Sequence, residues 1–309
     1  MPIFPEILIA AASFAPWRDA AAAIAAALAA SSILLGLWNY RPAVSETTLV
    51  SAAWWAAAAT LAIAGVELAR AALPLADAWL APLRFCAAAL SFCPFVAVIG
   101  AKRPQHLPWN FVVLSLWGIV SLSALTALAM QRNDRFILGD ARAWLLWALI
   151  VMGYINYLPT RNQFAALLVA LGQIILFAPH LPLLRGIGWL ANLPAGPSLG
   201  LFLFAMALAV VGRASQPVSD GQESSSYKFD RLWLDFRDLF GLLWGLRLQE
   251  RVNAASSSAN WEVDLAWSGF KGKDIPAKNR EALRQAMTGL LRRFVSHEWI
   301  AARLEKGVD

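Results

Sequence analysis

Long apolar segments constrain this chain more than any other feature of its sequence. A helix that crosses a bilayer needs about 20 mostly apolar residues, and seven segments within residues 1–213 reach or approach that length. Charged residues, prolines and glycines separate them, where helix ends should meet water or lipid headgroups. The expected fold class is therefore an all-α polytopic integral membrane protein with about seven transmembrane helices. The predicted spans are residues 19–39, 48–71, 82–101, 109–130, 142–159, 163–184 and 191–212.

The composition agrees with a membrane protein. Hydrophobic residues make up 59% of the 309 residues and charged residues only 15%, which is more apolar surface than one soluble core would bury. An ordinary soluble globular protein is therefore excluded. Tryptophan occurs 15 times, and its amphipathic ring favours the headgroup level of a bilayer. Several copies lie at the ends of predicted spans, namely Trp17, Trp38, Trp79, Trp109, Trp144 and Trp189.

Charge divides the chain near residue 213. Residues 1–213 contain 12 basic and 7 acidic residues, whereas the last 96 residues contain 14 and 13. We therefore expect a transmembrane domain over residues 1–213 and a small, mostly helical soluble domain over residues 227–309. Residues 214–226 are polar and serine-rich and show no apolar periodicity. This composition predicts a flexible tether between the two domains.

An amphipathic helix opens the C-terminal domain. Large apolar side chains recur with helical spacing between residues 229 and 252. A face so rich in aromatic residues lies in the membrane interface, packs under a second helix or binds a partner. Gly241 and Gly245 have a spacing that permits the close approach of another helix. The aromatic residues that define this face are Phe229, Trp233, Phe236, Phe240 and Trp244.

The remainder of the C-terminal domain predicts a short strand and a second helix. Residues 261–267 alternate between apolar and polar side chains, which is typical of an extended segment. Residues 277–305 return to helical spacing after Pro276, a residue that suits a helix start. About 80 ordered residues are few for an independent core. We therefore expect this domain to dock on the transmembrane domain or on a partner.

Polar side chains within the predicted spans are candidates for function, because such groups are costly in lipid. Glu67 and Arg70 lie three residues apart near the end of the second span and predict an ion pair. A transport or proton-relay site is the alternative for this pair. Gln173 lies in the middle of the sixth span and Asn156 near the end of the fifth. Both amides predict hydrogen bonds between helices, with a substrate-lining role as the alternative.

No catalytic, metal or cofactor motif is complete. His297-Glu298 begins like the zinc motif His-Glu-x-x-His, but Ala301 stands in place of the second histidine. The segment 269–274 is similar to a phosphate loop only in part, because Asp274 stands where a hydroxyl is needed. We therefore predict no cofactor, no metal site and no catalytic residue. The nearly balanced charge of the C-terminal domain also predicts no nucleic-acid binding.

Charge does not decide the orientation of the chain in the membrane. Basic residues near the span ends total seven on each side of the bilayer, so the positive-inside rule gives a tie. The adjacent Lys102 and Arg103, with no acid in the same turn, favour a cytoplasmic C-terminal domain in a cell or inner membrane. The segment before Arg18 contains Glu6 and lacks a basic start, which predicts a short interfacial segment rather than a cleaved signal peptide.

Three functions are compatible with these features. We expect a non-catalytic membrane subunit or scaffold, anchored in the lipid bilayer, whose C-terminal domain binds a protein partner. The missing catalytic motifs and the small apolar C-terminal domain favour this function. The second possibility is a small-solute permease that uses Glu67, Arg70, Asn156 and Gln173. The third is a lipid-modifying transferase, with the basic joint at residues 132–142 as the headgroup-binding candidate.

Overall fold

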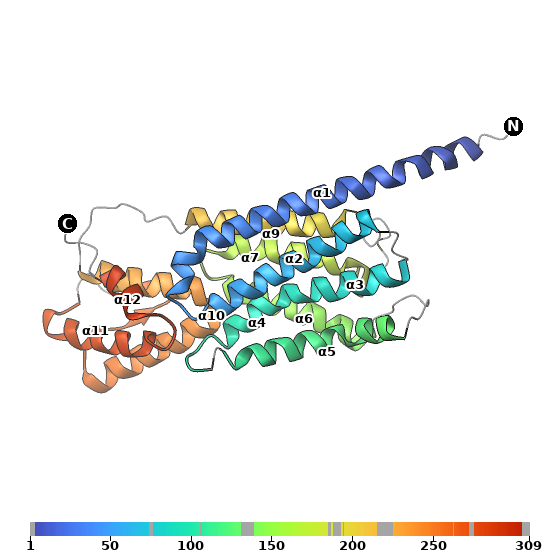
Figure 1. Ribbon diagram of the computed structural model, residues 1–309. Coiled ribbons are helices and arrows are strands. Elements are labelled where there is room, and N and C mark those ends of the chain that lie inside the picture. Colours follow the sequence, from blue (N-terminus) through green and yellow to red (C-terminus); the bar gives the residue numbers. More distant parts are fainter. Residues whose placement is uncertain are drawn as a thin grey trace.

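The structure is almost entirely helical, which confirms the all-α fold class. A bundle of long helices has a group of C-terminal elements packed at one end (Figure 1). We call residues 225–304 the tail. The end of the bundle against which the tail packs is called the tail-facing end. The computed structural model describes residues 4–73, 77–105, 107–130, 139–184, 187, 193, 195–214, 225–261, 263–271 and 275–304.

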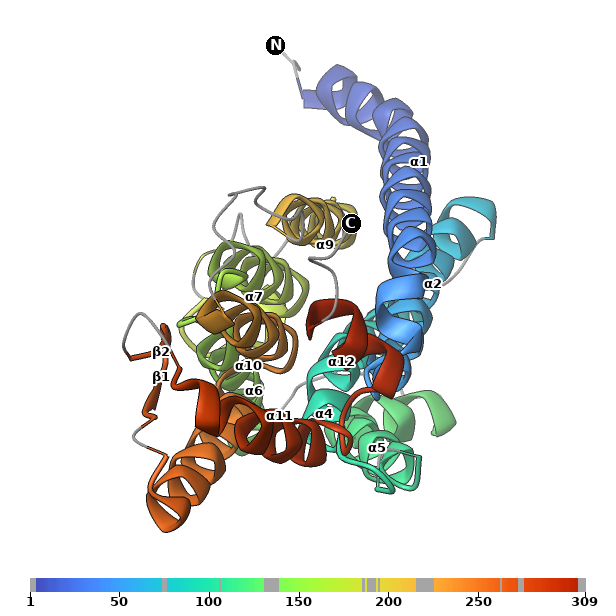
Figure 2. The same cartoon turned by 90° about the vertical axis from the view of Figure 1, so that its left-hand side faces the viewer.

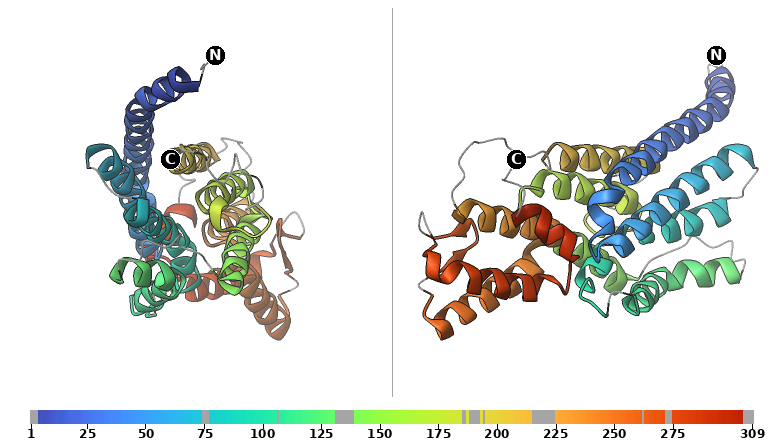
Figure 3. Two further views of the ribbon diagram at one scale, coloured as in Figure 1. Left: turned by 90° about the vertical axis from the view of Figure 1, so that its right-hand side faces the viewer. Right: turned by 60° about the vertical axis from the view of Figure 1, so that its left-hand side comes forward.

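The helices of the bundle run back and forth along one axis. Helix α1 begins far from the tail and ends beside it, and each following pass reverses direction (Figures 1 and 3). The third pass is broken into α3, the 3-10 turn η1 and α4, with Pro94 in the first turn of α4. The elements are α1 (Phe4–Ser45), α2 (Val50–Ala72), α3 (Asp77–Ala89), η1 (Leu90–Phe92), α4 (Cys93–Ile99), α5 (Trp109–Ala129), α6 (Asp140–Tyr157), α7 (Gln163–Phe177), η2 (Ala178–His180) and α9 (Gly196–Ala214).

Five helical segments among the described residues are long and apolar enough to cross a membrane. They make the chain compatible with a multi-pass membrane protein. The apolar part of α9, Gly196–Gly212, is shorter, and α6 carries Asp140 and Arg142 in its first turn. The residues before the predicted first span belong to the same helix, which begins at Phe4. They do not form the separate interfacial segment that the sequence predicts. The five segments are Trp17–Ser45, Val50–Ala72, Trp79–Ile99, Trp109–Ala129 and Gln163–His180.

Small residues allow the helices to approach one another closely. A β-carbon added to Gly172 of α7 would lie 3.1 Å from the carbonyl oxygen of Gly200 in α9, so these two backbones meet at a pair of glycines. Alanines of α1 and α2, among them Ala26 and Ala64, fill the neighbouring core. Lipid tails are as apolar as leucine, so close packing rather than hydrophobic burial holds such helices together.

The tail differs from its predicted layout in three ways. The predicted helix at residues 229–252 is part of a longer helix that is broken at Gly241. The predicted extended segment contains only a two-residue strand, which pairs with a second one in a tight antiparallel hairpin. The predicted helix at residues 277–305 is split in two. The tail elements are α10 (Ser225–Ala259), β1 (Leu265–Ala266), β2 (Gly269–Phe270), α11 (Ala277–Leu291) and α12 (His297–Leu304).

Backbone hydrogen bonds to the bundle explain the split between α11 and α12. The carbonyl of Phe294 accepts the N–H of Thr48 at 2.8 Å, and the N–H of Ser296 donates to the carbonyl of Glu46 at 2.7 Å. Thr47 and Val295 form a β-bridge between the same two segments. These contacts use the backbone groups that a continuous helix would have paired internally. The tail is thereby attached to the loop between α1 and α2.

The aromatic face of α10 lies inside the chain. Phe236 and Phe240 are fully buried, and both pack with Trp244 around Phe294, with ring centroids 4.8–5.4 Å apart. Phe229 and Trp233 belong to the same core, which also contains Leu49, Val98 and Ala101 from the bundle. The sequence allows this face to lie in the membrane interface, to pack under a second helix or to bind a partner. In the structure it packs against other helices of the chain. Figure 2 shows α11 and α12 lying across the tail-facing end.

Part of the predicted organisation lies outside the described residues. This applies to residues 215–224 of the predicted tether, while Ala214 ends α9 and Ser225 begins α10. It also applies to residues 131–138 of the basic joint and to residues 272–274 of the partial phosphate loop.

Replacing Phe294 by alanine should destabilise the tail. Phe294 is 6% exposed and contacts three aromatic rings of α10, so its loss should lower the free energy of unfolding by ~3–5 kcal/mol. Denaturant titration of the purified protein in detergent, followed by tryptophan fluorescence, measures this change. Phe111→Ala is the matched control, because Phe111 is 75% exposed on α5. Equal losses in both variants would show that Phe294 does not anchor the tail.

Candidate functional site

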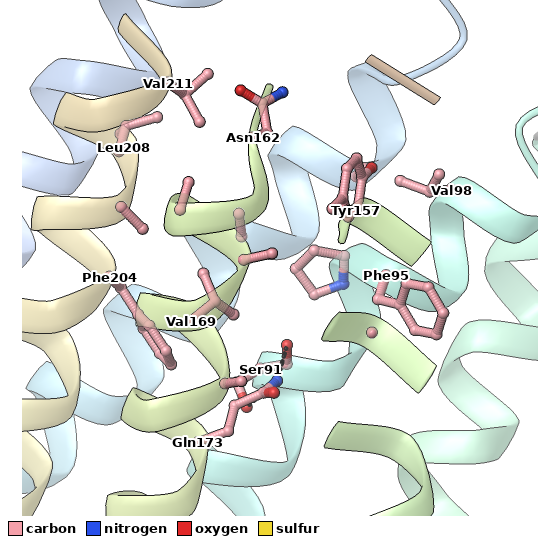
Figure 4. A pocket seen from close by; sticks show the side chains of 18 of the residues that line it. Ser91, Phe95, Val98, Tyr157, Asn162, Val169, Gln173, Phe204, Leu208 and Val211 are labelled. Atoms are coloured by element: carbon pink, nitrogen blue, oxygen red, sulfur yellow. Dashed lines mark hydrogen bonds between the residues drawn. The ribbon is translucent and has the colours of Figure 1, made fainter. Parts of the chain in front are cut away.

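A central cavity of about 380 Å³ lies between the helices and the tail. Helices α1, α2, α4, α6, α7 and α9 form its walls, and α10 contributes to the tail-facing end (Figure 4). Side chains such as Phe95, Val169 and Phe204 make most of the lining apolar. The polar residues of the lining are Thr60, Ser91, Tyr154, Tyr157, Asn162, Gln173 and Asp238.

Gln173 and Ser91 mark the end of the cavity that lies deeper in the bundle. The amide of Gln173 donates to the carbonyl oxygen of Ser91 at 3.1 Å and lies 3.4 Å from its hydroxyl (Figure 4). Pro94, three residues after Ser91, has no N–H to offer in this 3-10 turn. The hydrogen bond between helices that the sequence predicts for Gln173 is therefore present, and the same side chain lines the cavity.

Side chains at the end of α6 and just before α7 hold α10 at the other end of the cavity. The hydroxyl of Tyr157 donates to the carbonyl of Leu239 at 3.2 Å, and the amide of Asn162 donates to the carbonyl of Asp238 at 2.8 Å. Figure 4 shows both residues at the end of the cavity opposite Gln173 and Ser91. The Asp238 carboxylate itself accepts from the guanidinium of Arg237 at 2.7 Å. This end of the cavity is polar but electrically compensated.

The break at Gly241 is what brings the α10 carbonyls to these partners. Gly241 has φ 77° and ψ −168°, a combination that residues with a side chain rarely adopt. Its α-carbon also approaches α6 closely, because an added β-carbon would lie 2.7 Å from the backbone oxygen of Asn156. The side-chain oxygen of Asn156 accepts the N–H of Leu243 at 3.1 Å. Asn156 therefore pairs with the broken helix, and its buried Nδ2 has no hydrogen-bond acceptor among the described residues.

Glu67 and Arg70 lie away from the cavity, among the helix ends remote from the tail. Glu67 accepts two hydrogen bonds of 2.6 Å from the guanidinium of Arg84, whereas its distance to Arg70 is 3.9 Å. Arg70 instead contacts Asp19 at 2.6 Å. The predicted pair is thus the weakest link of a four-residue network across α1, α2 and α3. Sequence spacing finds contacts within one helix, and it gave no signal for Arg84 or Asp19.

The remaining chemistry-bearing residues do not gather at the cavity. Cys86 and Cys93 are both buried and unbridged. In the part of the chain that the structure describes, no three His, Cys, Asp or Glu side chains lie close enough together to hold a metal ion. Among the described residues that line the cavity, the titratable side chains are Tyr154, Tyr157 and Asp238. What this site offers is a mainly apolar volume with Gln173 and Ser91 at one end and Tyr157 and Asn162 at the other.

Comparisons of this chain with protein-family models, with curated proteins and with solved structures found no match.

Replacing Glu67 by glutamine should destabilise the bundle. Glu67 is 2% exposed, so the change leaves the Arg84 guanidinium without its counter-charge in a largely buried site. Breaking a buried pair costs ~3–5 kcal/mol, and thermal unfolding in detergent should show the loss. Asp19→Asn is the control, because the more exposed Asp19–Arg70 contact should contribute only about 1 kcal/mol or less. A larger effect at Asp19 would contradict this assignment.

Replacing Gly241 by alanine should loosen α10 from the bundle. Strained backbone at one residue costs about 1–3 kcal/mol, and the new methyl group would also press on Asn156. We expect faster proteolysis within the tail and a lower unfolding midpoint. Gly289→Ala on α11 is the control, since an added β-carbon there meets nothing within 4 Å. Unchanged proteolysis of Gly241→Ala would mean that the break does not hold the tail.

Proposed function

We propose that this protein is a membrane carrier of the permease class, which binds a neutral, largely apolar small molecule in the central cavity. The cavity is the observation that carries the proposal. Its walls come from most of the bundle helices, its lining is mainly apolar, and its hydrogen-bonding groups lie at the two ends. Sites for small molecules commonly combine a mostly apolar lining with a few placed polar groups.

We further propose that α6 and α9 complete a bundle of seven membrane-crossing helices. Both lie alongside the five longer segments in the same bundle (Figure 1). An odd number of crossings puts the start of α1 and the tail on opposite sides of the bilayer. The Lys102-Arg103 turn lies at the tail-facing end, so we place the tail in the cytoplasm.

The lining favours a neutral ligand. Asp238 is the carboxylate at the cavity, and it is already paired with Arg237 at 2.7 Å and with Arg161 at 3.6 Å. A charged ligand would therefore have to displace an existing ion pair. A lipid-like molecule with a hydrogen-bonding terminus fits better, because Gln173 and Ser91 offer polar atoms at the deeper end and apolar surface extends from them.

Two other functions have less support. A scaffold whose tail binds a partner was expected from the aromatic face of α10, but this face packs against the chain's own helices. A lipid-modifying transferase was expected to use the joint at residues 132–142, most of which lies outside the described residues. The permease proposal retains Gln173 as a lining residue and gives Asn156 the task of holding α10.

A photoreactive fatty alcohol tests the proposal. The purified protein is irradiated with the probe and digested, and mass spectrometry locates the label; we expect it on the segments around Phe95, Val169 and Phe204. Val169→Phe should fill part of the cavity and weaken binding about tenfold, which corresponds to two fewer buried methylenes.

Leu167→Phe is the matched control for this experiment. Leu167 lies on the same helix but is 39% exposed, so the added ring should point away from the cavity and leave labelling unchanged. Label confined to the outer faces of the helices, or equal loss in both variants, would refute binding in the cavity. Gln173→Ala should shift the position of the label within the cavity, since the polar terminus loses its partner.

A further inference from the structure

We infer that a small hollow where the tail meets the α4–α5 loop binds a phosphate-bearing anion. The hollow has a volume of about 60 Å³ and lies outside the central cavity. Four cationic side chains line it, and the remaining lining is apolar, chiefly Trp244 and Phe294. The cations are Lys102, Arg247, Arg251 and Arg293.

Three separate segments of the fold bring these cations together. Arg247 and Arg251 lie one turn apart on α10, and Lys102 follows α4. Arg293 follows α11, and its carbonyl accepts the N–H of Arg103 at 2.8 Å. This backbone bond holds the Lys102 loop beside the α11–α12 segment. The cluster is therefore a product of tail docking and not of one basic stretch of sequence.

The four cations have no carboxylate partner among the described residues. In the part of the chain that the structure describes, no ion pair joins any of them to Asp or Glu, whereas Arg161, Arg237 and Arg303 are each paired. Like charges one turn apart on a helix repel each other. A bound anion would relieve this repulsion, and guanidinium groups match phosphate oxygens with two parallel hydrogen bonds.

The floor of the hollow is held in place. The indole N–H of Trp244 donates to the carbonyl of Val98 at 2.9 Å, and the Phe294 ring packs against Trp244 with centroids 4.8 Å apart. The guanidinium of Arg247 lies 5.3 Å from the centre of the Trp244 ring, within range of a cation–π contact. A fixed aromatic lining beside four cationic side chains suits a compact anion.

The hollow lies close to the expected membrane surface. Lys102 comes three residues after α4 ends, and α5 begins with Trp109. Leu107 and Phe111, each two residues from Trp109 in the sequence, are 67% and 75% exposed, as expected of lipid-facing residues. The phosphate of an anionic lipid can reach the hollow from here with its acyl chains along α5, and a soluble phosphate compound is the other source of the same group.

Binding of phosphatidylglycerol to the full-length protein tests this inference. Native mass spectrometry in detergent counts the bound lipid molecules, with phosphatidylcholine as the neutral comparison. A second measurement compares the unfolding midpoint of the protein in inorganic phosphate with its midpoint in sodium chloride of equal ionic strength, and a higher midpoint in phosphate indicates binding of a soluble phosphate compound. We expect Arg247→Gln/Arg251→Gln to weaken binding about thirtyfold, because each basic residue near an anionic surface contributes about a factor of five.

Two further variants make the outcome decisive. Lys278→Gln/Arg284→Gln removes two charges from the exposed side of α11, away from the hollow, and should bind as the wild type does. Arg247→Lys/Arg251→Lys keeps the charge and should retain most of the binding even if the glutamine variant unfolds. Preference for phosphatidylglycerol alone identifies an anionic lipid as the source of the phosphate group. Stabilisation by inorganic phosphate identifies a soluble phosphate compound as the source. Equal losses in the glutamine and control pairs, or no preference for either anion, would overturn the inference.

Discussion

The need of every backbone polar group for a partner governs how the tail and the bundle fit together. A helix broken at Gly241 leaves N–H and carbonyl groups close to apolar surroundings, where unpaired groups are costly. Asn156, Asn162 and Tyr157 supply the partners from the ends of α6 and α7. The same break turns α10 across the central cavity. The position of α10 beside the cavity and the attachment of the tail thus both depend on one backbone constraint.

Five of the seven predicted spans coincide with described helices that are long and apolar enough to cross a membrane, because lipid imposes a simple length requirement on a spanning helix. The predicted spans 142–159 and 191–212 correspond to α6 and α9, which are not among those five. The boundaries of α2 and α5 fall within two residues of the predicted ones. The tail was predicted less well. Asn253 bonds both backbone groups of Leu265, which a period-2 pattern would assign to a partner strand. A side chain that takes the place of a partner strand in this way leaves no periodic pattern in the sequence.

The candidate site could be predicted only where polar residues interrupt apolar helices. Gln173 and Asn156 stood out for this reason, and both have structural partners near the cavity. Tyr157 and Asn162 gave no such signal, because polar residues are ordinary at helix ends. Asp238 lies among the charged residues of the polar side of α10, so its position beside the cavity depends on the break at Gly241.

The shared core of the tail also sets an order for the maturation of this chain. Its aromatic residues follow the bundle in the chain, and Leu49, Val98 and Ala101 of the bundle complete their burial. Without those bundle residues in place, Trp233, Phe236 and related side chains would remain exposed to chaperones and proteases. A folded tail therefore requires that the early helices of the bundle are already packed in their places.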